Sequence, residues 1–269
     1  MSVLAGLAAV VIGFLSGILS GMFGVGGAVL TTPGVRLLGA TPIEAVGSTI
    51  PAILPGSLSG ALRYARKGMV DWHVATTCGL IGSAMAVAGG ALSDHVNAHY
   101  LMLLTAALLL WTGVKDIGAV RAPARVVVPA VDDDALILEA DEGRSGDVPL
   151  ARVGAIGAAA GLLAGLLGVG GGILMVPAFS RILHLSPKRA VATSLVAVAI
   201  FSVPAMITHA LLGHINWGFA LCLLAGVVPG AQIGAHLTIG GSERRLRILS
   251  GTFFSVLAIA YGISELRAL

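Results

Sequence analysis

Two glycine-rich stretches carry the clearest chemical potential in this sequence. Glycine weakens a helix by roughly 1 kcal/mol per residue relative to alanine, so repeated glycines in apolar sequence predict a helix break. Free backbone N–H groups at the start of the next helix attract anions, and glycine leaves no side chain between them and a ligand. We therefore predict an anion site made mostly of backbone, at Gly24, Gly26, Gly27, Gly168, Gly170, Gly171 and Gly172.

A pair of adjacent hydroxyl residues follows each glycine stretch. Ser48-Thr49 and Thr193-Ser194 lie about two turns into the helices expected after the glycines, deep enough to meet the two breaks. Their hydroxyl groups can donate to an oxyanion. The alternative is a hydrogen bond to the carbonyl of the preceding helical turn. Both readings fit the sequence, and the first adds these four residues to the predicted substrate site.

Composition indicates an integral membrane protein. The chain has 269 residues, of which 57% are hydrophobic and 11% charged, and its mean hydropathy is +0.97. Apolar runs of about 20 residues are long enough to cross a bilayer as helices. None of them alternates with the period of two that is typical of a barrel strand. We therefore predict an all-α, polytopic fold. The spanning helices are expected at 43–63, 70–92, 98–118, 187–210, 216–239 and 246–266.

The chain reads as a duplication. Shifted by 144 residues, seven positions of the first stretch match the second, from Gly13 on Gly157 to Pro33 on Pro177. After a slip of one residue the match continues at a spacing of 145. In both halves it includes two predicted helix starts, one with a hydroxyl N-cap followed by proline and one with an Asp or Asn N-cap followed by tryptophan. These starts are Thr41-Pro42, Ser186-Pro187, Asp71-Trp72 and Asn216-Trp217. We place the first repeat at 1–118, an acidic cytoplasmic linker at 119–150 and the second repeat at 151–269.

The distribution of positive charge predicts that the two repeats have opposite orientations. Each glycine segment, 3–38 and 152–184, has arms of about 16 and 12 residues, shorter than the roughly 20 that a full span requires. If each segment enters and leaves on one side of the membrane, or crosses twice, nearly all Lys and Arg residues fall on the cytoplasmic side, leaving only Arg36 and Arg267 opposite. The predicted fold is thus two inverted repeats, each with a broken or re-entrant helical hairpin and three transmembrane helices.

Several polar residues near the predicted helix ends have two readings. Arg36 and Arg181 either draw anions toward the site or extend to the membrane interface. His209, Gln232 and His236 are candidates for a proton or anion path, and an interfacial position is the alternative.

The sequence argues against several other classes of protein. There is no basic run rich in aromatic residues, so nucleic acid is not an expected partner. The glycine stretches join two apolar helical runs, whereas a dinucleotide-binding loop follows a strand. No His-Glu-x-x-His motif or nucleophile–base pair is present, so we predict neither an enzyme nor a metal or cofactor site. Cys78 and Cys222 are interpreted as small core residues.

The combined motifs resemble the TauE/SafE sulfite exporter family, also called the toluene-sulfonate uptake permease family. The resemblance covers both halves, and the second half is closer, because the first has Ala28 where the last glycine of the run would stand. It is carried by the duplicated glycine loops with Pro33 and Pro177, by Thr41-Pro42 and Ser186-Pro187, by the run from Ala190 to Ser194, by His209, and by the run from Pro229 to Ala235.

The resemblance implies a function as well as a fold. It implies secondary transport of small sulfur-containing anions, such as sulfite, sulfoacetate or other organosulfonates, across the bacterial cytoplasmic membrane, outward in many members. With inverted repeats this predicts alternating access. The alternatives are an uptake permease or a channel for another small anion, or a membrane assembly factor that transports nothing. Duplicated irregular backbone at membrane depth argues against an assembly factor.

Overall fold

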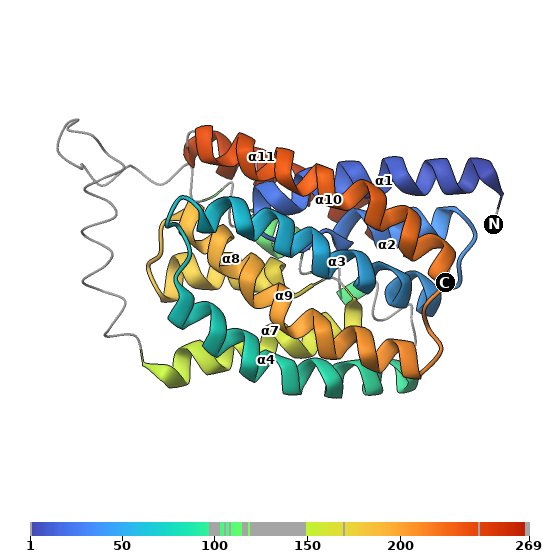
Figure 1. The fold of residues 1–269 in the computed structure, drawn as a ribbon, viewed down its shortest axis with the longest axis horizontal. Helices are drawn as coiled ribbons and strands as arrows, with labels where there is room; N and C mark the ends of the chain where they lie inside the picture. The colour runs from blue at the N-terminus through green and yellow to red at the C-terminus, as the bar shows by residue number, and fades with distance from the viewer. Residues whose placement is uncertain are drawn as a thin grey trace.

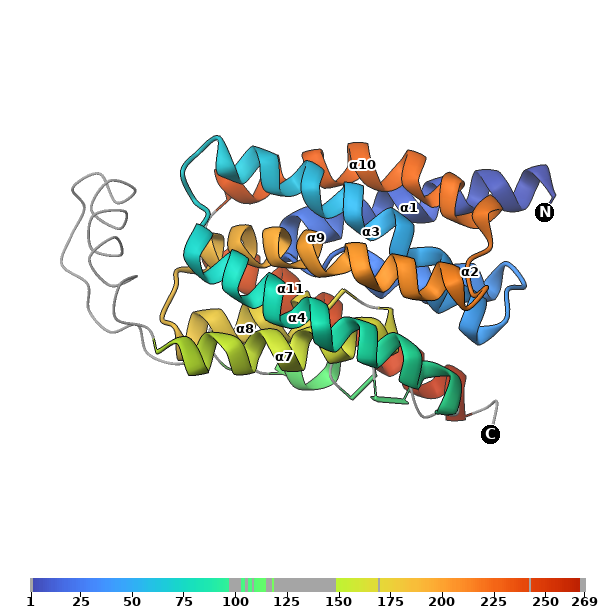
Figure 2. The ribbon, with the colours of Figure 1, turned by 60° about the horizontal axis from the view of Figure 1, so that its bottom comes forward.

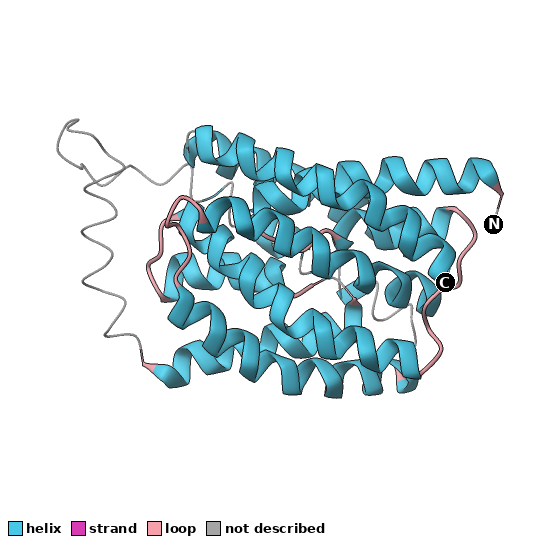
Figure 3. Cartoon of the chain, viewed as in Figure 1, coloured by secondary structure: helices cyan, strands magenta, loops and turns pink. Residues whose placement is uncertain are grey.

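Helices form all of the regular secondary structure in the described part of the chain (Figure 3). The structure is a computed structural model, and it describes residues 2–96, 103–104, 106–107, 109–114, 118, 149–168, 170–241 and 243–266. Within these ranges six helices are long and apolar enough to span a bilayer: α1 (Val3–Phe23), α3 (Pro42–Ala65), α4 (Trp72–Leu92), α7 (Leu150–Leu167), α9 (Pro187–Leu211) and α10 (Trp217–Gly240). The predicted all-helical, polytopic membrane fold is confirmed.

The remaining elements are shorter or lie at the edge of the described residues. They are α2 (Ala28–Leu37), α8 (Gly172–Ile182), α11 (Glu243–Leu266) and a short 3₁₀ turn, η1 (Ser93–His95). α11 covers the span predicted at 246–266. The span predicted at 98–118 is described only in part, at 103–104, 106–107, 109–114 and 118, and the linker predicted at 119–150 lies outside the described residues except for 149–150.

The arms around the glycine stretches are less alike than expected. α1 has 21 residues and α7 has 18, so both first arms are long enough to be candidate spans. Only the second arms are short, at 10 residues for α2 and 11 for α8. The expectation of two short arms is wrong for the first arm, because α1 has 21 residues and α7, which begins already at Leu150, has 18, against the expected 16 or so.

The predicted helix starts are confirmed. Thr41 accepts a hydrogen bond from the backbone N–H of Glu44, whose carboxylate accepts one from the N–H of Thr41, with Pro42 in the first turn. Ser186 caps α9 in the same way. Asp71 and Asn216 cap α4 and α10. In each case the side chain satisfies a backbone donor that the first helical turn leaves without a partner.

Close packing between the halves follows two rows of glycines. α1 lies along α10, and α4 lies along α7 (Figures 1 and 2). A methyl group added at Gly17 would collide with the backbone of Val227, and one added at Gly161 would collide with the backbone of Gly82. Since small residues let membrane helices approach to backbone contact, these glycines join the first helix of each half to the fourth helix of the other half. α3 and α9 run through the middle and are the most enclosed of the six.

The ends of the molecule differ in charge. Figure 1 shows both termini at one end and the connections 66–71 and 183–186 at the other. Corresponding helices of the two halves run in opposite directions, α1 away from the end with the termini and α7 toward it. The connection 66–71 carries Arg66 and Lys67, whereas Arg36 ends α2 near the termini. The assignment of these ends to the two sides of a membrane stays a prediction.

The outer surface is suited to lipid. Large apolar side chains are exposed along the outer face of α1, including Leu4, Leu7 and Val11. Trp72 and Trp217 are more than half exposed at the starts of α4 and α10. Tryptophan at helix ends is typical of the membrane interface.

Candidate functional site

Both glycine stretches break the helix with the same backbone geometry. α1 ends at Gly24 with φ of +72°, and α7 ends at Gly168 with φ of +63°. The residues that precede α2 and α8, Gly27 and Gly171, also have positive φ, at +91° and +64°. Residues with a Cβ rarely adopt this left-handed conformation, which explains why glycine recurs at matching positions. The predicted helix breaks are confirmed at these positions.

The two breaks meet in the interior. A methyl group added at Gly26 would lie 3.6 Å from Cα of Gly170, and one added at Gly170 would lie 2.9 Å from the carbonyl oxygen of Val25. All of these residues are buried. The structure therefore brings the two predicted glycine sites together as one contact between loops from opposite halves.

Two hydroxyl residues hold the loops across the contact. The Ser194 hydroxyl donates to the carbonyl oxygen of Gly24 at 3.0 Å, and the Thr49 hydroxyl donates to that of Gly168 at 3.4 Å. Each also contacts a carbonyl one turn back in its own helix, Val191 and Val46 respectively. Their hydrogens are thus directed at backbone oxygens, and each loop is fixed by a side chain from the other half.

The neighbouring hydroxyls make a second matched pair of contacts. Ser48 accepts a hydrogen bond from the backbone N–H of Asn216 at 2.8 Å, and Thr193 accepts one from that of Asp71 at 3.0 Å. Both hydroxyl residues are completely buried. Since Asn216 and Asp71 cap α10 and α4, these contacts fix the start of the fourth helix of one half against the third helix of the other.

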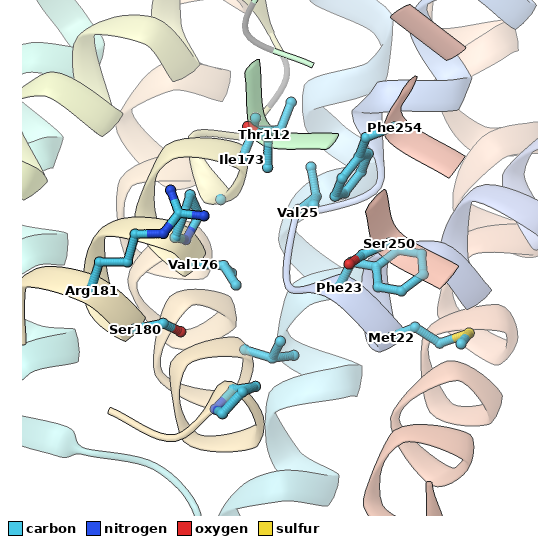
Figure 4. A pocket seen from close by; sticks show the side chains of 14 residues that line it. Met22, Phe23, Val25, Thr112, Ile173, Val176, Ser180, Arg181, Ser250 and Phe254 are labelled. Carbon is cyan, nitrogen blue, oxygen red and sulfur yellow. The ribbon is translucent and has the colours of Figure 1, made fainter. Parts of the chain in front are cut away.

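A pocket with a volume of about 100 Å³ opens beside the loops. Its wall combines Val25 of the first break, Gly172 at the start of α8, and side chains from α8, α9 and α11. Figure 4 shows the Arg181 guanidinium on one side and the Phe23 and Phe254 rings on the other. Arg181 is the cation among the residues that line this pocket, and the first turn of α8 adds the positive end of a helix dipole. The pocket therefore combines positive potential with an apolar wall.

Several predicted residues lie away from the loops. Arg36 lines neither this pocket nor the smaller cavity near α2. Gln232 and His236 are exposed on the outer face of α10, where the Arg63 guanidinium lies 3.1 Å from Nδ1 of His236. The two glycine stretches and Arg181 thus come together at the pocket, whereas Gln232 and His236 lie away from it.

His209 acts on the second break through the backbone. It is fully buried, with Nε2 2.9 Å from the carbonyl oxygen of Gly165 and Nδ1 3.1 Å from Nδ1 of His214. Tyr64, its counterpart in the first half, donates its hydroxyl to the carbonyl oxygen of Gly21 at 2.8 Å. Both side chains hold the last turn before a helix break, and only the second half uses a titratable pair there.

Sequence reasoning missed five polar or aromatic side chains of the pocket, namely Phe23, Thr112, Ser180, Ser250 and Phe254. For Ser180, the one available signal was its position next to Arg181 in the sequence. Ser250 and Phe254 are spaced by one helical turn in α11, so they share a face, but a single serine in an apolar helix does not indicate a site.

Other chemistry has little support in the described ranges. Within them, no three His, Cys, Asp or Glu side chains come together in a way that could hold a metal ion. Cys78 is buried and its Sγ lies 3.1 Å from the carbonyl oxygen of Val153, where α4 meets α7. This is a packing position.

Comparison with known proteins gives a consistent result. Residues 9–261 match the family described as sulfite exporter TauE/SafE. The probable membrane transporter protein YunE of Bacillus subtilis is 29% identical over 85% of this chain and 86% of its own length. A probable membrane transporter protein of Xylella fastidiosa is 25% identical over 92% and 91%, and YfcA of Escherichia coli, with the same description, is 21% identical over 88% and 81%. No solved structure matches.

Proposed function

Because the chain belongs to the sulfite exporter TauE/SafE family, and is thus a multi-pass membrane transporter and not an enzyme, we propose that it moves small sulfur-containing anions across the bacterial cytoplasmic membrane. Sulfite, sulfoacetate and related organosulfonates are the proposed substrates, and export is the proposed direction. One observation carries the proposal: two helix breaks from opposite halves meet beside a pocket that contains Arg181.

The pocket supports an anion for two reasons. Irregular backbone within a membrane is tolerated only where it is enclosed by protein or lines a watered cavity. Here the loop residues are buried, and Val25 and Gly172 also line the pocket. The positive end of α8 and the Arg181 guanidinium act on the same space, in which a sulfonate or sulfite group has three oxygens available for hydrogen bonds. The apolar wall suits the carbon substituent of an organosulfonate.

In the proposed site the residues have different roles. The ligand contacts the backbone at Gly172, which lines the pocket. The other predicted glycines shape the two loops beside it, namely Gly24, Gly26, Gly27, Gly168, Gly170 and Gly171. Ser48, Thr49, Thr193 and Ser194 act through the backbone that they hold, and Arg181 attracts the anion. His209 is the proposed proton-binding group, and gain or loss of a proton on its ring would change its contact with the Gly165 carbonyl before the second break.

Alternating access follows from the arrangement of the halves. The pocket is lined mainly by second-half residues, among them Arg181, whereas Arg36 near the other end lines neither described cavity. In the alternating-access cycle, the pocket beside Arg181 would close and an equivalent opening on the Arg36 side would form. The loops would thus face first one side of the membrane and then the other.

The test is ligand binding and flux with purified protein. Sulfite should raise the thermal midpoint of unfolding more than sulfate or chloride at equal ionic strength, and proteoliposomes should take up labelled sulfite with saturation and counter-exchange. Arg181→Gln should raise the half-saturating sulfite concentration about tenfold, equivalent to ~1.4 kcal/mol. Arg36→Gln is the matched control and should change it less than threefold, as expected of a distant screened charge.

Each contrary outcome has a defined meaning. Flux without saturation would indicate a channel, and preference for another anion would replace sulfite as substrate. Absence of both stabilisation and flux for every anion would overturn the proposed function.

A further inference from the structure

Three hydroxyl side chains of the first half gather around one backbone oxygen. The Ser16 hydroxyl on α1 donates to the carbonyl oxygen of Gly27, and the Thr31 hydroxyl on α2 donates to the same oxygen at 3.2 Å. The Ser20 hydroxyl, one turn after Ser16, completes a group that we call the hydroxyl cluster. Each of the three side chains is 1% exposed.

Ser20 is the unusual member of the cluster. Its Oγ is buried, and in the described part of the chain it has no hydrogen-bond partner. An unpaired buried hydroxyl costs about 1–3 kcal/mol, so its position calls for an explanation. Ser16, Ser20 and Gly27 line a cavity of about 10 Å³, which Phe253 and Phe254 of α11 also line. That volume holds one particle the size of a water molecule and is too small for a sulfonate.

The second half has the same backbone here without the hydroxyls. The residues at the positions of Ser16, Ser20 and Thr31 are Ala160, Ala164 and Met175, all buried and apolar. Gly171 takes the place of Gly27 with the same left-handed backbone. A helix break of this shape therefore does not need hydroxyls for its own stability. The cluster is an addition specific to the first half.

The chemistry of the cluster favours a cation. Ser16 and Thr31 direct their hydrogens at the Gly27 carbonyl, so an anion in the cavity would find one hydroxyl donor, Ser20, beside an electron-rich carbonyl oxygen. A metal cation would instead find three oxygens, those of Ser16, Ser20 and the Gly27 carbonyl, once the hydroxyl hydrogens rotate away. All three are neutral, and none of these residues is acidic, which suits a single charge better than a divalent ion. Broken helices with exposed carbonyls are used for such ions in other transporters.

We propose that the hydroxyl cluster binds a monovalent metal cation the size of Na⁺, coordinated by the carbonyl oxygen of Gly27 and the hydroxyl oxygens of Ser16 and Ser20, while Thr31 holds the Gly27 carbonyl from α2. The cavity lies directly behind the first helix break, since Phe23, Val25 and Phe254 line both this cavity and the anion pocket. Binding there fixes Gly27 and hence the loop that faces the pocket. The role of the cation as a coupling ion rests on the proposed transport function, whereas its binding to the cluster does not.

The experiment is thermal unfolding of the purified full-length chain in chloride salts of Na⁺, K⁺ and choline at constant ionic strength. Na⁺ should raise the midpoint of wild type in a saturable manner, and K⁺ and choline should not. Ser20→Ala places in the first half the residue that the second half already has, so it should fold, and it should raise the half-saturating Na⁺ concentration at least about tenfold. Ser57→Ala is the matched control, because Ser57 is also buried with no partner for its hydroxyl in the described chain and lies outside the cluster; it should keep the wild-type Na⁺ response.

Three results would overturn the cation site: equal midpoints in the three salts, a full Na⁺ response in Ser20→Ala, or stabilisation that follows the anion when fluoride replaces chloride. The first would leave a water molecule as the occupant. If sulfite still stabilises the protein in choline, the proposed transport function stands without the cation. If Na⁺ stabilises and no sulfur-containing anion does, the cation site stands and the proposed substrate fails.

Discussion

At Gly24 and at Gly168 the chain leaves a helix with nearly the same backbone, and in both places a hydroxyl from the other half holds the last carbonyl. The surroundings then differ. Beyond the second break, α8 brings Arg181 to a pocket of about 100 Å³. Beyond the first, α2 brings Val29 and Leu30 to a cavity of about 10 Å³, which Ser16 and Ser20 of α1 also line. The backbone of the two halves matches where positive φ requires glycine, and the side chains and cavities around it differ in size and charge.

A second difference lies at the first residue after each break. Ala28 starts α2 and Gly172 starts α8. A methyl group on Gly172 would lie 2.7 Å from Cα of Val25 and even closer to the carbonyl oxygen of Gly24, whereas Ala28 carries its methyl group in full burial. The first stretch can therefore have alanine at position 28, whereas the second stretch needs glycine at position 172, because only there would a methyl group collide with the opposite loop.

The largest expected effect on stability comes from the contact of Gly172 with the loop at Gly24 and Val25. Gly172→Ala should destabilise the protein by about 3 kcal/mol, because the two loops must separate to admit the methyl group. Ala28→Gly is the control and should cost about 1 kcal/mol. Equilibrium unfolding in mixed micelles measures both. Equal effects would contradict the asymmetry between the loops.

An intermediate effect is expected where aromatic side chains hold the last helical turn. His209→Phe removes contacts to both Gly165 and His214 and should cost about 2 kcal/mol, whereas Tyr64→Phe removes one hydroxyl from Gly21 and should cost about 1 kcal/mol. The same unfolding assay distinguishes them. A larger loss of unfolding free energy in Tyr64→Phe than in His209→Phe would contradict this prediction.

The smallest effect is expected at the hydroxyls that cross between the halves. Ser194→Ala should cost about 1 kcal/mol and Thr49→Val about 0.5 kcal/mol, since the Ser194 contact to the opposite loop is 3.0 Å and that of Thr49 is 3.4 Å. Differences of this size require denaturant titration with several replicates. If Thr49→Val proves the more damaging, the distances do not rank the two contacts.

The helices and their breaks were predictable because they follow from local rules. Hydroxyl and carboxamide caps at Thr41, Ser186 and Asn216 act on backbone a few residues away, and positive φ limits the residue type at Gly24 and Gly168. The length of α1 was underestimated, because one arm length of about 16 residues was assigned to both stretches, whereas α1 has 21 residues and α7 has 18.

The candidate site was only partly predictable, because its contacts connect distant positions. Ser194 and Gly24 are separated by 170 residues, and the pocket wall draws on α1, α8, α9 and α11. Gln232 and His236 illustrate the other difficulty. α10 is apolar on every side, so periodicity did not reveal that these two side chains face outward.

The packing of α1 along α10 also governs the order in which the protein can be built. The glycines of α1 contact residues such as Leu223 and Val227, which are synthesised some 200 residues later. Until α10 enters the membrane, the glycine face of α1 and the carbonyl of Gly24 lack the partners that the finished protein gives them. The nascent first half can therefore form mainly the contacts among α1, α2 and α3, and the larger contacts of α1 with α10 and of α4 with α7 form after the second half is made.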